Sequence, residues 1–162
     1  MQIIETTSLA TEHRETLCIL WNQEYPVNVS FKTLADFDNY LNNLTATTHY
    51  LLQNDFGQIG GWAFTFTRES EKWFAILLDR KIQGQGKGSL LLDKLKEKEQ
   101  KLHGWVVDHD NYVKSDGQPY LSPLAFYVKN GFAVCSETRF ETEQLSAVKI
   151  TWKAKQNAQL WA

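Results

Sequence analysis

Residues 83–92 read QGQGKGSLLL, with Gly84, Gly86 and Gly88 in one short loop that runs directly into leucines. Glycine is the usual residue where the backbone turns sharply or approaches a ligand closely. At the start of a helix, such a loop offers free backbone N–H groups and the positive end of the helix dipole, which together can bind a pyrophosphate. The loop alone leaves open the alternative of a β–α turn without a ligand.

Two common phosphate-binding loops do not fit the spacing. A Walker loop needs a glycine five positions before Gly86 and a serine or threonine after Lys87, and this chain has Lys81 and Gly88 there. A Rossmann fingerprint needs G-x-G-x-x-G, and these glycines are one residue too close together. The pattern that fits is Q-x-x-G-x-G, which starts at Gln83, follows a predicted strand and opens a predicted helix.

Hydrophobic periodicity and turn residues around this loop predict a mixed α/β domain. The predicted strands cover residues 2–6, 48–54, 58–68, 72–79, 105–108, 132–137 and 146–152. Three of the predicted helices start at Ser8, Ser30 and Ser122 as N-cap residues. The other helix covers 87–103, with Leu102 on its apolar stripe, and ends at Gly104. The three middle strands follow one another through short turns, which favours an antiparallel meander.

Length and composition restrict the class of protein. The chain has 162 residues, and we expect one domain over 1–153 followed by a tail over 154–162. The formal net charge of −2 gives no basic field that would attract nucleic acid. The longest apolar run, Trp73–Leu78, is too short to span a bilayer, and the first residues lack the apolar core of a signal peptide. Cys18 and Cys135 match no metal or redox spacing. We expect a reduced cytoplasmic protein that uses no metal, nucleic acid or membrane.

At the sequence QGQGKG of residues 83–88, the chain resembles the GNAT superfamily, the Gcn5-related N-acetyltransferases. Their signature [R/Q]-x-x-G-x-G/A follows the fourth strand and opens a long helix. A second family element, a short helix ending Y-x-x-x-G-F, has its counterpart in FYVKNGF, residues 126–132. The predicted order β-α-α-β-β-β-α-β-α-β-β is also the order of the family. The resemblance covers nearly the whole chain and implies an α/β fold with a mostly antiparallel central sheet flanked by helices.

The resemblance implies an N-acetyltransferase that transfers an acetyl or other acyl group from coenzyme A to an amine. It places the coenzyme pyrophosphate on the backbone amides of the glycine loop and the pantetheine arm along the end of the preceding strand. It also implies that Tyr127 protonates the departing thiolate. The residues implied to bind the cofactor are Leu77, Leu78, Asp79, Gln83, Gly84, Gln85, Gly86, Lys87, Gly88, Ser89, Ser122 and Tyr127.

The chain departs from the family pattern at two positions. The family often has a proline three residues before the glutamine, and this chain has Arg80 there. Many members have an asparagine seven residues before the tyrosine, where this chain has Tyr120. Ser122, at a predicted helix start, is the candidate to replace the coenzyme contact that the asparagine makes.

An amine that attacks a thioester must first lose a proton, so the reaction needs a base or a chain of water molecules. His109 and Asp108 lie at the end of the predicted strand 105–108, and Glu24 follows the first helix. We favour His109, because an imidazole ordinarily titrates near pH 6.5. Strand alternation would place His109 on the same face as Trp105 and opposite to Asp108. Proton transfer to water alone is the alternative.

Three aromatic residues, Trp21, Tyr25 and Phe31, surround the predicted loop between the first two helices. This loop usually walls the acceptor pocket in the family that the chain resembles. The rings could hold an amine by its apolar body or by a cation–π contact, and plain core packing is the alternative. We expect a small-molecule or peptide amine as the acceptor and leave a homodimer open as the assembly. The competing hypotheses are a non-catalytic module that binds acyl-coenzyme A or another protein, and an unrelated nucleotide binder.

Overall fold

The structure is a computed structural model that describes residues 1–155, so residues 156–162 of the predicted tail lie outside the described part. The described strands form one sheet in the order β1-β2-β3-β4-β5-β7-β6. They are β1 (Gln2–Thr6), β2 (Thr45–Gln53), β3 (Ile59–Arg68), β4 (Glu71–Leu78), β5 (Lys101–Val106), β6 (Ala133–Glu141) and β7 (Ser146–Lys153). All neighbouring strands are antiparallel except β4 and β5. The predicted α/β fold with a mostly antiparallel sheet is confirmed.

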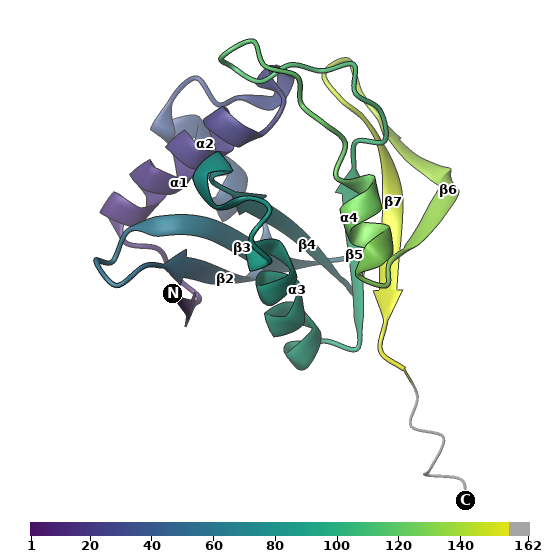
Figure 1. Ribbon diagram of the computed structural model, residues 1–162, viewed down its shortest axis with the longest axis horizontal. Helices are drawn as coiled ribbons and strands as arrows, with labels where there is room; N and C mark the ends of the chain where they lie inside the picture. Colours follow the sequence, from purple (N-terminus) through teal and green to yellow (C-terminus); the bar gives the residue numbers. More distant parts are fainter. Residues whose placement is uncertain (156–162) are drawn as a thin grey trace, which may run out of the picture.

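Helices cover both faces of this sheet (Figure 1). They are α1 (Thr11–Glu24), α2 (Leu34–Asn42), α3 (Lys87–Lys98) and α4 (Leu124–Lys129), with short 3-10 turns η1 (Val27–Val29) and η2 (Arg80–Ile82). One hydrophobic core lies between the sheet and the pair α1 and α2, and a second lies between the sheet and the pair α3 and α4. Within residues 1–155, no helix combines the length and apolarity that a membrane crossing requires.

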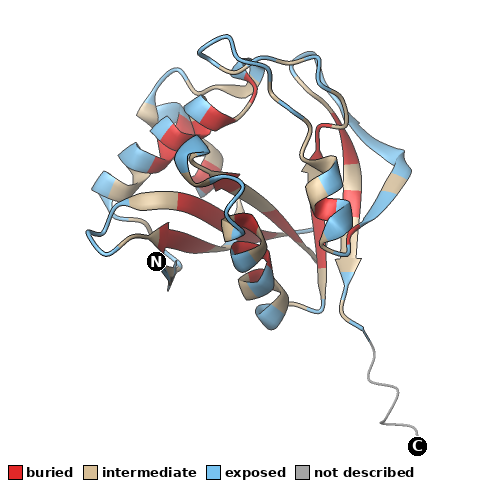
Figure 2. Cartoon of the chain, viewed as in Figure 1, coloured by how far each residue is buried: buried red, intermediate tan, exposed pale blue. Residues whose placement is uncertain are grey.

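Strand β4 lies at the boundary of the two cores because alternate side chains of a strand point to opposite faces. Trp73 and Leu77 belong to the core under α1 and α2, whereas Phe74 belongs to the core under α3 and α4. Figure 2 shows buried residues in the central strands and on the inner sides of the helices, while the loop before α3 is exposed. The fold therefore presents β4 to both sides of the molecule and leaves the loop after it open to solvent.

The sheet is divided between β4 and β5. These two strands are parallel and paired at one position only, Trp73 with His103. Beyond it they diverge, with β4 paired to β3 on its other side and β5 paired to β7 (Figure 1). The edge of β4 that faces β5 is therefore unpaired from Phe74 to Leu78, which leaves backbone hydrogen-bonding groups available there.

The predicted helix over 87–103 is wrong at its C-terminal end. Helix α3 ends at Lys98, and β5 starts at Lys101. Leu102, predicted on the helical stripe, is fully buried on β5. Gly104, predicted as the helix end, lies within β5, where a Cβ atom would be 2.9 Å from Cε1 of Phe74. This glycine is required by a close approach between two strands rather than by a helix terminus.

The predicted N-cap residues Ser8 and Ser30 are also wrong. Helix α1 starts at Thr11, because Ser8 forms a local turn in which its amide donates to Oγ1 of Thr6 at 3.2 Å. Helix α2 starts at Leu34, and its N-cap is Thr33, whose hydroxyl accepts from the amide of Asp36 at 3.1 Å.

The segment before α2 is held extended by side chains of α1. Asn22 donates to the carbonyl of Phe31 and accepts from its amide, both at 2.9 Å, and Nε1 of Trp21 donates to the carbonyl of Val29 at 3.0 Å. A helix cannot start at Ser30 while these backbone groups are bonded to α1. Helix α4 starts at Leu124, one residue later than a cap at Ser122 predicts, although the Ser122 hydroxyl accepts from the amide of Leu124 at 3.2 Å.

Candidate active site

The loop between β4 and α3 exposes backbone amides at the start of a helix. Gly84 and Gly86 have φ angles of 76° and 78°, and a Cβ atom at either position would meet no atom within 4 Å. The first hydrogen bond of α3 joins the amide of Leu90 to the carbonyl of Gly86 at 3.1 Å. The amides of residues 87–89 consequently have no acceptor within the helix, and the helix dipole points its positive end at the same place. This arrangement suits a negatively charged group.

Two of the residues predicted to bind the cofactor have structural contacts in this loop. A Cβ atom on Gly88 would lie 2.9 Å from Cζ of Phe126 and 3.4 Å from Cδ1 of Leu78, so this glycine lets α3 pack closely on α4 and β4. The Gln83 side chain donates to the carbonyl of Leu78 at 2.9 Å and braces the loop against the end of β4. A binding role for Gln83 or Gly88 would act through the backbone.

The other predicted cofactor residues line the same region. Leu77, Leu78 and Asp79 end the unpaired edge of β4, and Asp79 turns the chain into η2 by accepting from the amide of Lys81 at 2.8 Å. Gln85 donates to the carbonyl of Lys81 at 3.2 Å. Gln83, Gly84, Gln85, Gly86, Lys87, Gly88 and Ser89 follow as one continuous turn into α3. The structure therefore brings the strand edge and the helix start into one continuous surface.

Tyr127 belongs to a group of three tyrosines from different parts of the chain. Burial raises the pKa of the Tyr127 hydroxyl well above its ordinary range, and the nearby Tyr120 raises it further. Burial also raises the pKa of Tyr120 to about 12. The pKa of Tyr25, at the end of α1, is raised by burial and by both of the other tyrosines. Burial is the main cause in each case, so all three hydroxyls stay protonated at neutral pH.

The position of Tyr127 is set by aromatic packing on the α3 and α4 side. Its ring lies edge-on to Phe74 on β4 at 5.8 Å and to Phe132 at 5.6 Å, measured between ring centroids. Tyr120 was not among the residues predicted for the site and appeared only as a departure from the family pattern. Its spacing of seven residues from Tyr127 was the signal that could have identified it.

Solved acetyltransferase structures share the fold of this chain. An aminoglycoside 6'-N-acetyltransferase complexed with coenzyme A matches with a TM-score of 0.73 and 10% identity, over 97% of this chain and 99% of its own. A GNAT superfamily phosphinothricin acetyltransferase from Sinorhizobium meliloti, in complex with AcCoA, matches with a TM-score of 0.65 and 10% identity, over 98% and 92%. This chain has the GNAT fold. The ribosomal-protein-S18-alanine N-acetyltransferase from Escherichia coli matches with a TM-score of 0.62 and 17% identity, over 99% and 100%. No protein-family profile and no curated protein sequence matches the chain.

Within this GNAT fold, both oxygens of the Glu24 carboxylate accept hydrogen bonds from neighbouring residues. Glu24, one of the candidate bases, is therefore not free in this structure. The Glu24 residue as a whole is 5% exposed. Its Oε2 accepts from the backbone amide of Arg80 at 2.9 Å and from Nε of Arg80 at 3.3 Å, and its Oε1 accepts from Nζ of Lys114 at 2.9 Å. We call these three residues the Glu24 clamp. It ties the end of α1 to the loop before α3 and to the loop before α4.

The clamp explains why the chain has Arg80 where a proline is frequent. Proline has no backbone N–H, so it could not donate to Glu24 as Arg80 does. The guanidinium of Arg80 also pairs with Asp116 and donates to the carbonyl of Gln23 at 3.2 Å. Arg80 therefore connects the start of the glycine loop to two other segments.

The remaining candidate bases and Ser122 have protein partners of their own. Strand β5 ends at Val106, so the expectation that strand alternation orients His109 is wrong. Nδ1 of His109 accepts from the amide of Asn111 at 3.2 Å, and its role as a base stays a prediction. Asp108 pairs with Arg139 at 2.8 Å and 3.0 Å, and these hydrogen bonds lower the pKa of the Asp108 carboxyl. Ser122 donates its hydroxyl proton to the carbonyl of Val107 at 2.6 Å, so a coenzyme contact through this hydroxyl also stays a prediction.

The three predicted acceptor residues form one aromatic cluster. Trp21 is 7% exposed, with ring centroids 4.5 Å from Tyr25 and 5.1 Å from Phe31. Tyr25 and Phe31 are half-buried and lie at the edge of the core under α1 and α2. Trp21 therefore supports the wall that the other two rings form. Contact with an acceptor stays a prediction for all three.

Proposed function

We propose that the protein is an N-acetyltransferase that moves an acetyl group from acetyl-coenzyme A to a primary amine of a small molecule or peptide. The observation that carries this proposal is the unpaired edge of β4, which is followed, after η2 and the glycine loop, by a helix start whose amides lack acceptors within the helix. The GNAT fold supports it, because solved structures with this fold are named as N-acetyltransferases. A cytoplasmic location belongs to the same proposal, and a homodimer is left open as the assembly.

The residues at this surface fit coenzyme A. The loop amides of residues 84–89 would bind the pyrophosphate, since Gly84 and Gly86 leave open space above the backbone. The unpaired groups of β4 up to Leu77, Leu78 and Asp79 would bind the amide groups of the pantetheine arm. Acetyl-coenzyme A, when bound, supplies an activated thioester carbonyl for attack by the amine.

Tyr127 is the proton donor in this proposal. Its raised pKa keeps the hydroxyl protonated at neutral pH, so it can donate a hydrogen bond to the sulfur as negative charge develops there and pass its proton as the C–S bond breaks. The nearby Tyr120 raises the pKa of Tyr127 further. His109, or water, takes the proton from the attacking amine. Backbone amides at the end of β4 can stabilise the negative charge that develops on the carbonyl oxygen.

The experiment compares two glycines of the same conformation. Gly86→Glu places a carboxylate in the space assigned to the pyrophosphate, so calorimetric affinity for acetyl-coenzyme A should fall by roughly 100-fold through repulsion and steric exclusion. Gly57→Glu is the control, because Gly57 has the same open surroundings and a φ of 76° but lies in the turn between β2 and β3.

Equal affinity in the two folded variants would refute the loop as the coenzyme site. Binding of acetyl-coenzyme A without turnover of any amine in a broad panel would instead favour the non-catalytic binding module. Preference for ATP or NAD over coenzyme A in the same titration would favour the unrelated nucleotide binder.

A further inference from the structure

A group of unpaired hydrogen-bond donors surrounds one indole ring on the α1 and α2 face of the sheet. We propose that the amine acceptor carries an acidic group, a carboxylate or a phosphate, that binds to Arg68, Lys149 and Trp105 around Trp73. We call these four residues the cationic patch. The inference rests on the proposed function, since it names the class of acceptor for the same reaction.

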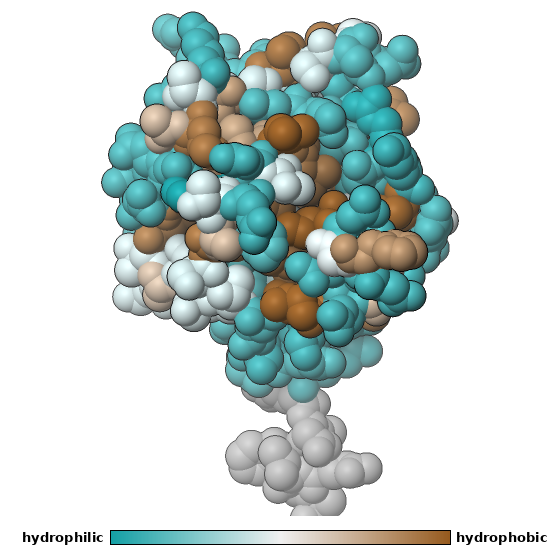
Figure 3. All heavy atoms as spheres, turned by 90° about the vertical axis from the view of Figure 1, so that its left-hand side faces the viewer, coloured by the Kyte–Doolittle hydropathy of each residue, from teal (hydrophilic) through white to brown (hydrophobic). Residues whose placement is uncertain are grey.

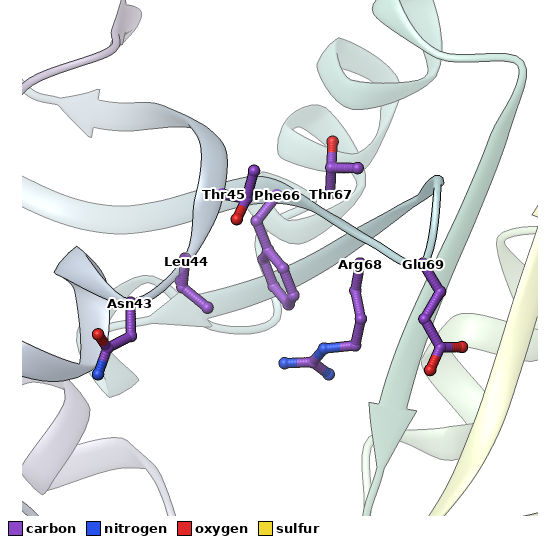
Figure 4. Close-up of a pocket in the computed structure, with 7 residues that line it drawn as sticks. All are labelled: Asn43, Leu44, Thr45, Phe66, Thr67, Arg68 and Glu69. Carbon is purple, nitrogen blue, oxygen red and sulfur yellow. The ribbon is translucent and has the colours of Figure 1, made fainter.

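Arg68, at the end of β3, lies over aromatic rings and has no acidic partner among residues 1–155. Its Cζ atom is 5.0 Å from the ring centroid of Phe66 and 5.6 Å from that of Trp73. No ion pair of the described residues includes Arg68. In Figure 4, Phe66 and Arg68 project into the same hollow, while the carboxylate of the neighbouring Glu69 points away from the guanidinium. The hollow has a volume of about 290 Å³, is open to solvent and is lined by residues 43–45 and 66–69, so of the cationic patch it includes Arg68 alone. The guanidinium is therefore available to a ligand.

Lys149 brings a second cation to the same ring from β7. Its Nζ atom is 5.4 Å from the Trp73 ring centroid. Lys149 pairs directly with Trp105 across β5 and β7, so their side chains share one face of the sheet. None of the ion pairs within residues 1–155 includes Lys149. Two cations near one indole repel each other unless an anion joins them.

Trp105 adds a buried donor. Its ring centroid lies 5.1 Å from that of Trp73, and its Nε1 atom is buried without a hydrogen-bond partner among the described residues. A buried N–H without an acceptor is rare, because losing its water costs free energy that no bond returns. Because Nε1 is closed off from solvent, an acceptor atom of a ligand would reach it only after neighbouring side chains shift.

Nearby carboxylates do not neutralise the cationic patch. Glu71 already pairs with Lys101 at 3.3 Å and with His103 at 3.4 Å. Asp108 and Glu141 both pair with Arg139. What surrounds the Trp73 ring is thus two free cations and one free N–H, so the complementary group is negatively charged and rich in acceptors. Figure 3 shows the surface of the molecule on the side of α1 and α2, where apolar patches interrupt a mainly hydrophilic surface.

The position of Trp73 connects this patch to the reaction. Trp73 is the last residue of β4 paired with β5, and the unpaired edge starts directly after it. Ala75 and Leu77 follow on the same face, so the patch lies roughly 13 Å along the strand from Leu77. A short acceptor with an amine at one end and an acid at the other cannot extend as far as Leu77. Because the unpaired edge begins directly after Trp73, such an acceptor would place its acid on the patch and its amine at the start of this edge.

The experiment compares amines that differ only in charge. Calorimetry in the presence of coenzyme A would measure the binding of γ-aminobutyrate and ε-aminohexanoate against their amides, and of phosphoethanolamine against ethanolamine. We expect at least one acid to bind about tenfold more tightly than its neutral partner, since a hydrogen bond to a charged group contributes this much. The carboxylate and phosphate pairs distinguish the two kinds of anion. Turnover with acetyl-coenzyme A should show the same preference in KM.

Substitutions test which residues produce the preference for acidic amines. Arg68→Gln and Lys149→Gln should each remove most of the tenfold preference and leave binding of the neutral amines unchanged. Lys153→Gln is the control, because it removes one positive charge from the same face of β7 away from Trp73.

Three results would overturn the inference: equal binding of acids and neutral partners, no binding of either, or equal losses in Arg68→Gln and Lys153→Gln. A dimer in sedimentation that Arg68→Gln dissociates would also overturn it, by assigning the cationic patch to an interface between copies. Acetylation of neutral amines alone would refute the inference and leave the proposed function standing. Coenzyme binding without acetylation of any amine would refute the proposed function, whatever the charge preference.

Discussion

The face of the sheet under α3 and α4 is packed mainly by aliphatic side chains, and its candidate binding groups are backbone atoms. The face under α1 and α2 is packed by large aromatic rings, and its candidate binding groups are side chains. On the first face, Leu91, Leu92 and Leu95 of α3 are fully buried, and the open surface consists of glycine amides and a strand edge. On the second face, Trp21, Trp62 and Trp73 are buried among other rings.

This difference between the two faces separates binding of an invariant ligand, which backbone groups can provide, from selection of a particular acceptor, which needs side chains. Backbone amides have the same chemistry in every protein, so a helix start and an unpaired strand edge can bind one invariant ligand with almost any sequence around them. Side chains such as Arg68 and Lys149 differ from chain to chain and can select a particular acceptor. Tyr127 belongs to the core of the first face, and Tyr25 packs at the edge of the core of the second.

The largest expected effect is on stability, and it tests whether the buried carboxylate of Glu24 holds the segments of the two faces together. Glu24→Gln leaves Lys114, whose side chain is 14% exposed, without its charged partner. Removal of one member of a buried ion pair costs about 3 kcal/mol, and we expect this loss in the free energy of unfolding by urea. Glu15→Gln, an exposed position of α1, is the control and should change stability by less than about 0.5 kcal/mol. Equal stabilities of the two variants would show that the Glu24 clamp does not stabilise the folded protein.

The next effect concerns the boundary between the faces. Tyr127→Phe keeps the ring packed on Phe74 and removes the hydroxyl, so kcat should fall by roughly 100-fold with little change in coenzyme affinity. Tyr50→Phe is the matched control, because Tyr50 is also a buried tyrosine of the α3 and α4 core. Full activity in Tyr127→Phe would exclude Tyr127 as the proton donor.

The smallest expected effect is on the pH dependence of stability, and it tests what burial of the polar His49 side chain among aromatic rings costs in free energy. His49 is buried, its Nδ1 accepts from Nε1 of Trp62 at 3.1 Å, and burial lowers its pKa from 6.5 to about 4. The unfolded chain therefore takes up a proton below pH 6.5, while the folded protein does so only near pH 4. Stability contributed by neutral His49 is lost as the pH falls through this window, by about 2 kcal/mol between pH 7 and pH 5.

His49→Gln should flatten this part of the stability curve, since the amide oxygen of glutamine can still accept from Trp62. Urea unfolding at a series of pH values measures the difference, and NMR titration of the His49 ring reports its protonation directly. The same slope in both proteins would contradict a lowered pKa at His49.

The features that the sequence predicts well are those that depend on the backbone. Gln83, Gly86 and FYVKNGF at 126–132 have a spacing that identifies the fold, because a sharp turn and a helix start need particular residues at particular places. The boundary between α3 and β5 was missed, because Leu102 continues the helical period of Leu91 and Leu95 by coincidence of spacing. Periodicity cannot separate the last turn of a helix from a short buried strand.

The side-chain sites could not be predicted, because they depend on strand register. Arg68, Lys149 and Trp105 come from β3, β7 and β5, and the pairing of those strands brings them to one ring. Glu24 was considered as a base, and only the tertiary structure shows Arg80 and Lys114 around it. Tyr120 joins Tyr127 through a loop whose path local sequence does not specify.

The pairing of Trp73 with His103 is the one β-pairing within residues 1–155 that joins β4 to β5. The two parts of the sheet are joined there, so the simplest relative movement is a rotation about that point. Leu78 lies five residues, roughly 17 Å, from this pivot, so a rotation of about 5° would displace it by about 1.5 Å. Closure is limited by Gly88, where the ring of Phe126 already touches the backbone of α3. Small angular changes at one end of β4 are thereby converted into changes of atomic size at the other.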